Sequence, residues 1–217
     1  MSKEYYEDYW KGCFDNEGVL NKPPEFNYQE FLRVYNKINK YCGKTILDAG
    51  AGEGTFTHNI MKKLGKKRKT QTIAYEISGQ AIRLGKKRYP GLKFVQGDIT
   101  SMPFKTGSFD TVIAIEVVEH LLNINKVFSE FGRVLTNGGY LILTTTDFNL
   151  LKKILVSVIF WNKIFYPTNP HIRFFTRETL AQVAKKNNLF PVKHWWNGDY
   201  LHLMPKGQIA IFKKNGS

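Results

Sequence analysis

The chain has 217 residues, of which 42% are hydrophobic and 14% aromatic, so it is long enough to bury a substantial core in one domain. Its formal net charge of +14 could attract nucleic acid or an acidic membrane surface. Two cysteines cannot build a disulfide framework, and the charged start MSKEYYEDYW is unlike a secretory leader, so we expect a cytoplasmic protein.

The basic excess lies after Lys44, much of it in the runs Lys62–Lys69 (KKLGKKRK) and Arg83–Arg88 (RLGKKR). Each run is typical of the solvated end of a helix, where cations complement the helix dipole, and RNA binding is the alternative interpretation. The longest apolar block, Ile154–Trp161, is too short for a membrane-spanning helix of about 20 residues. We therefore expect no transmembrane segment.

Residues 1–44 contain no strand pattern. Apolar side chains recur there at near-helical spacing after a break at Lys22-Pro23-Pro24, which predicts a helical lead-in. The recurring residues are Phe26, Phe31, Leu32, Tyr35 and Ile38.

From Thr45 onwards, short apolar runs rich in β-branched residues alternate with amphipathic stretches. The helix before the fifth strand should be closed by Asn137-Gly138-Gly139. TVIAI and YLILTT are apolar on both faces, as in central parallel strands covered by helices on each side. The expected strands are Thr45–Ala49, Thr72–Tyr75, Lys93–Gln96, Thr111–Ile115 and Tyr140–Thr145, and the expected helices are about Thr55–Leu64, Gly79–Arg88 and about Asn125–Leu135.

The remaining chain is less regular. The apolar stretch Leu150–Tyr166 and a proline loop precede a helix that Thr176 should cap. Two late strands are expected near Phe190–His194 and Gln208–Lys213. No internal repeat or low-complexity linker forces a domain boundary. Because right-handed crossovers bring the carboxyl ends of parallel strands to one edge of the sheet, a ligand site is expected at that edge.

The stretch ILDAGAGEGTFT follows the first strand and holds Gly50, Gly52 and Gly54, with Asp48 and Glu53 around them. Glycine loops between a strand and a helix usually bind phosphate through backbone N–H groups. This loop lacks the Gly-Lys-Ser/Thr ending of a P-loop and the G-x-G-x-x-G spacing of dinucleotide sites. Its two carboxylates would repel a pyrophosphate and attract a cation.

More acidic residues follow the other strands. Glu76 ends the second strand, where such folds use an acid to accept hydrogen bonds from ribose hydroxyls. Asp98 follows the third strand, and Glu116 and Glu119 follow the fourth. The strand ends therefore predict an acidic pocket in a basic protein.

The motifs DAGAGEG, an acid ending strand two, GD, SFDTVIAIEVVEHL and RVLTNGGYLILTT occur in this order. From about Ile46 to Thr146 they resemble the class I S-adenosylmethionine-dependent methyltransferases. The resemblance implies a Rossmann-like, three-layer α/β/α sandwich with a seven-stranded, mostly parallel sheet and an antiparallel last strand. It divides a single methyltransferase domain over 1–217 into a lead-in (1–44), a cofactor-binding core (45–146) and a substrate-side insertion with the last strands (147–217).

The same resemblance implies roles in binding S-adenosylmethionine. Gly50 and Gly52 would let the backbone approach the methionine part, with Asp48 near its ammonium group. Glu76 would hold the ribose and Asp98 would accept from the adenine amine. Structural alternatives stay open, since glycines also make tight turns and Asp48 could cap the next turn. The other expected cofactor-binding residues are Ala51, Glu53, Ile77, Gly97, Ile99, Ile115 and Glu116, with Ile77 and Ile99 on the adenine faces or simply in the core.

The segment Glu116-Val-Val-Glu119-His120 is similar to one in ubiquinone-pathway O-methyltransferases, in which two carboxylates and a histidine hold a divalent metal. Oxygen ligands suit Mg²⁺. His120 could instead act as a general base, or pack locally. His171-Ile-Arg-Phe-Phe-Thr176 resembles a segment that closes the acceptor pocket in small-molecule and lipid-pathway members, so His171 is a second catalytic candidate. Alternatively, its phenylalanines are core residues and Thr176 is only a cap.

These features predict methyl transfer to a small-molecule or lipid-like acceptor, at oxygen rather than nitrogen. The Asn/Asp-Pro-Pro-Tyr/Phe motif of many amine methyltransferases does not follow strand four, and no cysteine lies where a cytosine-C5 enzyme needs one. Nucleic acid is disfavoured, and an RNA methyltransferase or a non-catalytic cofactor-binding protein is the alternative. LLKKILVSVIFWNKIFY could lie at a membrane interface, form a lid or be a buried helix. The sequence does not reveal the oligomeric state.

Overall fold

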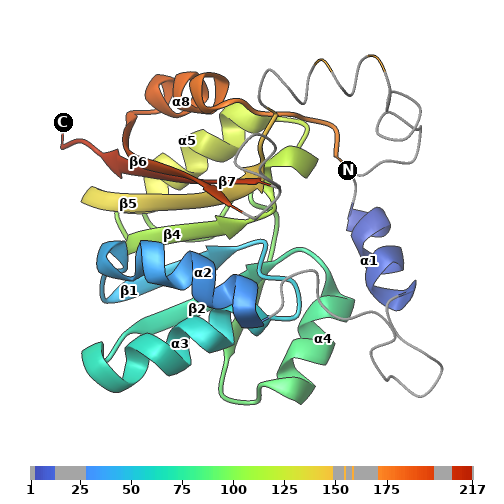
Figure 1. Ribbon diagram of the computed structural model, residues 1–217. Helices are drawn as coiled ribbons and strands as arrows, with labels where there is room; N and C mark the ends of the chain where they lie inside the picture. Colours follow the sequence, from blue (N-terminus) through green and yellow to red (C-terminus); the bar gives the residue numbers. More distant parts are fainter. Residues whose placement is uncertain are drawn as a thin grey trace.

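A single seven-stranded sheet organises the protein (Figure 1). The computed structural model describes residues 3–12, 28–148, 171–197 and 207–216 with the isolated positions 154 and 158, but not the side chains of 66–68. The strand order is β3-β2-β1-β4-β5-β7-β6, and β7 alone runs antiparallel to its neighbours. The strands are β1 (Thr45–Ala49), β2 (Gln71–Glu76), β3 (Lys93–Gln96), β4 (Phe109–Ile115), β5 (Leu135–Thr146), β6 (Leu189–Asn197) and β7 (Gly207–Lys214).

Helices cover both faces of this sheet (Figure 1). One apolar cluster joins α2 and α3 to the sheet through residues such as Phe31 and Ile60. The other joins α5 and α8 to the opposite face through residues such as Phe128 and Leu180. The predicted α/β/α sandwich is therefore confirmed. The helices are α1 (Lys3–Gly12), α2 (Tyr28–Ile38), α3 (Thr55–Arg68), α4 (Gly79–Arg88), α5 (Ile124–Val134) and α8 (Arg177–Lys186), with short 3₁₀ turns η1 (Asn39–Tyr41) and η2 (Val118–His120).

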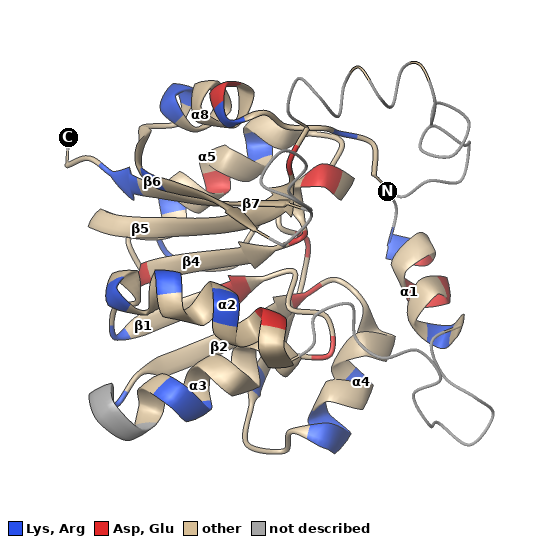
Figure 2. Cartoon of the chain, in the orientation of Figure 1, with Lys and Arg blue, Asp and Glu red and all other residues tan. Residues whose placement is uncertain are grey.

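The order of the strands places a switch point next to β1, where open α/β sheets bind ligands; we call the strand ends around it the crevice. Strand β1 pairs in parallel with β2 on one side and β4 on the other, so the direction of winding reverses between β1 and β4. At such a switch point the loops that follow the two strands separate and leave room for a ligand. In Figure 2 most of the acidic residues lie toward the end of the sheet where the parallel strands finish, while Lys and Arg lie mainly on the outer helices.

The predicted stop of α5 at Asn137-Gly138-Gly139 is wrong. The helix ends at Val134 and β5 begins at once, with the Asn-Gly-Gly sequence inside the strand. The pairing of β4 with β5 shifts there, from Phe109 opposite Leu135 to Thr111 opposite Tyr140. Gly138 has a φ of 79°, so the chain needs glycine for an irregular strand rather than for a helix end.

Other limits of the predicted elements also differ. Helix α3 runs past Leu64 to Arg68, because Gly65 is accommodated within the helix. No sequence pattern specifically predicted helix α1. It lies within the lead-in and precedes α2 as a separate helix. The Lys22-Pro23-Pro24 break, most of Leu150–Tyr166 and the following proline loop lie outside the described residues. In the described part of the chain, every helix falls short of the length and apolar character that a membrane span requires.

The contact between α4 and the glycine loop depends on Gly85. A Cβ atom added there would lie 2.5 Å from the backbone oxygen of Glu53 and 2.3 Å from the ring of Phe94. We expect Gly85→Ala to lower the free energy of unfolding by about 1–3 kcal/mol, because the helix must move away from the loop. Urea unfolding measures this change.

The matched control is Gly65→Ala in α3, where an added Cβ meets nothing within 4 Å. Alanine is the better helix former, so this variant should be more stable by about 0.5–1 kcal/mol. Equal effects of the two substitutions would contradict the close packing at Gly85.

Candidate functional site

The loop after β1 has a backbone that only glycine adopts without strain. Gly50, Gly52 and Gly54 have φ angles of 82°, 56° and 86°. The N–H groups of Gly50 and Ala51 both donate to the backbone oxygen of Tyr75, at 2.8 and 3.1 Å, which ties the loop to the end of β2. The glycines therefore bring the backbone close to the crevice, as expected for a loop that a ligand approaches.

Asp48 lies at the base of this loop and is 2% exposed. The hydroxyl of Thr57 in α3 donates to its Oδ2 at 2.6 Å, so the carboxyl group has a partner within the protein. Burial raises the pKa of Asp48 to about 7, and the nearby charge of Glu76 contributes to the increase. A cation bound next to Asp48 would favour its charged form.

The carboxylate of Glu76 joins two loops of the crevice. Its Oε2 accepts from the N–H of Gly52 at 2.9 Å, and its Oε1 accepts from the N–H groups of Ile77 and Ser78 at 2.9 Å each. Burial raises the pKa of Glu76 even though these hydrogen bonds lower it. The structure therefore holds this acid at the end of β2, at the predicted ribose position.

Glu53 has a different environment from the one we expected. It is buried, but its carboxylate accepts from the Thr55 hydroxyl and forms an ion pair with Arg88 at 3.3 Å. The negative charge of Glu53 is thus balanced within the protein. It holds α4 next to the glycine loop, and a role in attracting a ligand is not supported by this geometry.

The loop after β3 is fixed by Tyr75. Its hydroxyl donates to the backbone oxygen of Asp98 at 3.0 Å, and a Cβ on Gly97 would lie 2.1 Å from that hydroxyl. Ile99 is buried and Ile77 is half-buried. The side chain of Asp98 is exposed, and its Oδ1 accepts from the N–H of Thr100 at 2.8 Å. A contact from Asp98 to a ligand would therefore be partly solvated.

Strand β4 ends at the half-buried Ile115 and leads into a strained residue, Glu116. Its φ of 51° is uncommon for a residue other than glycine. The Glu116 N–H donates to both the backbone oxygen and the hydroxyl of Thr144, at 3.1 Å each. Such strain persists only where surrounding contacts impose it, and it is frequent at functional sites.

Glu119 is fully buried next to Glu116. The hydroxyl of Thr145 donates to its Oε2 at 2.9 Å, while its Oε1 has no hydrogen-bond donor. Burial raises the pKa of Glu119 well above its ordinary value, and the neighbouring charge of Glu116 raises it further. The protein therefore places two neighbouring carboxyl groups, Glu116 and Glu119, at this edge.

Two histidines lie beside Glu119. The ring centroids of His120 and His171 are 4.8 Å apart, and ligand atoms of Glu119, His120 and His171 lie within 4.8 Å of one another. The N–H groups of Ile172 and Arg173 donate to the Glu119 backbone oxygen at 3.1 Å, which brings His171 to this edge.

The three residues that lie together are not the predicted metal ligands, which were Glu116, Glu119 and His120. His171 takes the place of Glu116, so the set has two imidazoles and one carboxylate. Two imidazoles with one carboxylate favour a transition metal such as zinc or iron over Mg²⁺, which prefers oxygen ligands. The predicted Mg²⁺ is therefore not supported, and the assignment of any metal stays a prediction.

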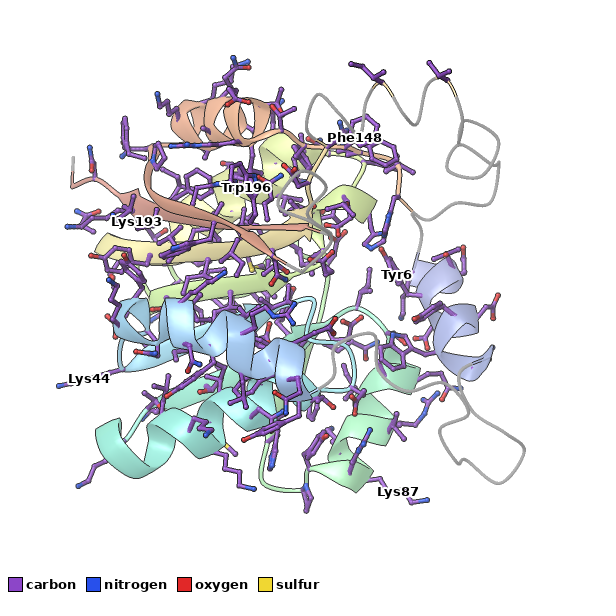
Figure 3. The ribbon with its side chains drawn as sticks, viewed as in Figure 1. Tyr6, Lys44, Lys87, Phe148, Lys193 and Trp196 are labelled. Atoms are coloured by element: carbon purple, nitrogen blue, oxygen red, sulfur yellow. The ribbon has the colours of Figure 1, made fainter. Side chains whose placement is uncertain are left out.

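The sequence interpretation missed three residues of α1. The carboxylate of Glu7 accepts from Ser78 Oγ and from the N–H groups of Gly79 and Gln80. A Cβ on Gly52 would lie 2.8 Å from the ring of Trp10, and Tyr6 points from α1 toward the strand ends (Figure 3). The only sequence signal for these residues was the mixture of acidic and aromatic side chains in MSKEYYEDYW. It matches no motif that would have predicted a role at the site.

Comparison with known proteins matches residues 47–143 to the family model described as a methyltransferase domain. A sterol 24-C-methyltransferase of Gibberella zeae is 39% identical over 99 residues, which are 45% of this chain and 26% of that protein. A malonyl-[acyl-carrier protein] O-methyltransferase of Legionella pneumophila is 27% identical over 157 residues, covering 71% of this chain and 54% of that protein. The chain thus spans about a quarter and about half of the length of these relatives.

The crystal structure of an S-adenosylmethionine-dependent methyltransferase from Methanosarcina mazei is similar to this fold, with a TM-score of 0.67. The two chains share 20% identity, and the match covers 84% of this chain and 99% of that one. At this identity the likeness shows a common fold.

The raised pKa of Asp48 predicts how stability depends on pH. The folded form binds a proton more tightly than the unfolded form, so the contribution of Asp48 is complete below about pH 4 and is lost as the pH rises through about 7. The loss can reach about 4 kcal/mol, at about 1.4 kcal/mol for each unit between 3.8 and about 7. Asp48→Asn should therefore gain stability relative to wild type between pH 5 and pH 8 in urea unfolding.

The matched control is Asp8→Asn, which neutralises an exposed carboxylate on α1. Its stability relative to wild type should be the same at both pH values. A constant difference between Asp48→Asn and wild type across this range would contradict the raised pKa.

Proposed function

We propose that the protein, which carries a class I methyltransferase domain over residues 47–143, transfers the methyl group of S-adenosylmethionine to a small-molecule or lipid-like acceptor, at an oxygen atom. The observation that carries the proposal is the left-handed glycine loop closed on Glu76 above the buried Asp48. A cofactor with a sulfonium and an ammonium group brings positive charge to this acidic crevice. A phosphate-bearing cofactor would bring negative charge, which these carboxylates would repel.

In this proposal Asp48 faces the ammonium group and the backbone of Gly50, Ala51 and Gly52 contacts the methionine part. Glu76 has hydrogen-bond capacity for ribose hydroxyls in addition to its three backbone donors. The residues on the adenine side are Ile77, Gly97, Asp98 and Ile99. The residues near the methyl group are Ile115 and Glu116. Glu53 is left out because it pairs with Arg88.

The bound cofactor supplies an activated methyl group, which leaves its sulfur as the acceptor oxygen attacks. The protein mainly aligns the two reactants, and alignment of this kind can lower a barrier by roughly 7–11 kcal/mol. A hydroxyl acceptor must also lose its proton. His120 and His171 lie at the same edge and offer imidazole nitrogens that can accept that proton, which is why we favour oxygen.

The class of acceptor follows from two kinds of support. The names of the sterol and malonyl-carrier methyltransferases place those relatives in lipid chemistry, although they act at carbon and at oxygen. In this chain the described acceptor edge has buried acids and imidazoles rather than a basic surface. A metal held by Glu119, His120 and His171 would polarise an acceptor hydroxyl, and RNA remains the competing acceptor because of the exposed Lys62, Lys63, Lys86 and Lys87.

Cofactor binding is tested with S-adenosylhomocysteine by calorimetry. We expect Glu76→Ala to weaken binding about ten-fold or more, because the ribose loses a charged partner and the Gly52 N–H loses its acceptor. Asp98→Ala should have a smaller effect, since its side chain is exposed. Glu178→Ala, on the surface of α8, is the control and should bind as wild type. Binding of NAD in place of S-adenosylhomocysteine would overturn the proposal.

Turnover is tested by the release of S-adenosylhomocysteine from S-adenosylmethionine in the presence of a lipid extract, a panel of hydroxylated small molecules or total RNA. We expect release with the lipid or hydroxylated fractions. His120→Gln and His171→Gln should lower kcat by about 10²–10⁴-fold if either acts as the base, with little change in cofactor affinity. Release with RNA alone, lost at high salt, would favour the competing function.

A further inference from the structure

The carboxylate of Glu7 joins helix α1 to the start of α4. Glu7 accepts hydrogen bonds from Gly79 N at 2.7 Å, Gln80 N at 2.9 Å and Ser78 Oγ at 3.0 Å. These donors lie at the start of α4, directly after the loop that follows β2. Partial burial alone would raise the pKa of Glu7, but the hydrogen bonds lower it, so the group is charged at neutral pH. It also complements the positive end of the α4 dipole.

The same helix presents two aromatic residues to the crevice. The Trp10 ring lies against Gly52, where an added Cβ would be 2.8 Å away. Figure 3 shows Tyr6 between α1 and the carboxyl ends of the strands. Burial raises the pKa of the Tyr6 phenol, as do the charges of Glu76 and Glu119. Tyr6 therefore lies on the side of α1 that faces the strand ends.

Docking of α1 buries its aromatic side chains only in part: Tyr5, Tyr6 and Trp10 are half-buried. The helix has 10 residues and none of them is fully buried. A helix of this length is marginal in water when isolated, so its stability must come from the surface on which it docks. That surface includes Gly52 and the residues after Glu76, which belong to the crevice itself. A change in the residues of the crevice should therefore affect how firmly α1 docks, and a change in α1 should affect the crevice.

We propose that α1 closes the cofactor pocket, with Tyr6 as a wall between the cofactor and the acceptor and Glu7 as the positioning residue that holds the helix on α4. This inference rests on the proposed function. Closure shields the pocket from water, which strengthens the charge interactions inside it. Because the Glu7 contacts are polar and only partly buried, α1 can open for exchange of the cofactor without disrupting the core.

The test of Glu7 compares Glu7→Gln with Glu4→Gln, which removes the same charge from an exposed position of α1. We expect S-adenosylhomocysteine to dissociate about ten-fold faster from Glu7→Gln, since a charged group with several hydrogen bonds is lost. Hydrogen–deuterium exchange of residues 3–12 should also be faster in this variant without ligand. Glu4→Gln should behave as wild type in both measurements, and the melting temperatures of both variants should stay close to that of wild type because no side chain of α1 is fully buried.

The outcomes separate this inference from the proposed function. Wild-type dissociation and exchange rates in Glu7→Gln would overturn the role of Glu7, whereas failure of the wild-type protein to bind S-adenosylhomocysteine would overturn the cofactor assignment and the inference with it. Tyr6→Ala should weaken binding and Tyr9→Ala, at an exposed position of the same helix, should not. Equal affinities of these two variants would overturn Tyr6 as a wall of the pocket.

Discussion

The buried carboxylate of Glu76 connects the parts of the crevice. One of its oxygens binds the glycine loop after β1 and the other binds the turn that leads into α4, so two loops from neighbouring strands share one acid. Gly52 can meet this acid because it adopts a left-handed backbone. Arg88 and Glu53 then fix the far end of α4 to the same loop. A small set of charge-assisted contacts thus shapes a pocket that apolar packing alone would leave undefined.

The sheet was predictable because central parallel strands are apolar on both faces and bounded by turns. β4 and the second half of β5 keep long buried runs, and their positions follow from that pattern. The Asn-Gly-Gly sequence was misinterpreted because a helix stop and an irregular strand need the same residues. Helix α1 could not be inferred, since its docking depends on Glu7 and not on an apolar periodicity.

The candidate site was predictable to a smaller extent. The sequence places Asp48 and Glu76 at strand ends, and both are buried there. It could not show that Glu53, from the same motif, is neutralised by Arg88, 35 residues later. It did name His120 and His171 together as catalytic candidates, and their rings are 4.8 Å apart. The two backbone hydrogen bonds to the Glu119 oxygen that bring His171 there could not be inferred. Long-range partners decide which acid of a motif remains available to a ligand.

The raised pKa values of Asp48 and Glu119 have a common physical meaning. Each acid costs stability when it is charged without a positive partner, and the folded protein pays that cost continuously at neutral pH or keeps the group protonated. A cation that binds next to Asp48 would stabilise its charged carboxylate. This relief of the destabilisation in the unliganded protein would contribute to the binding free energy. Under the proposed function, the acids at the strand ends would favour a positively charged ligand, although the protein as a whole has a net charge of +14.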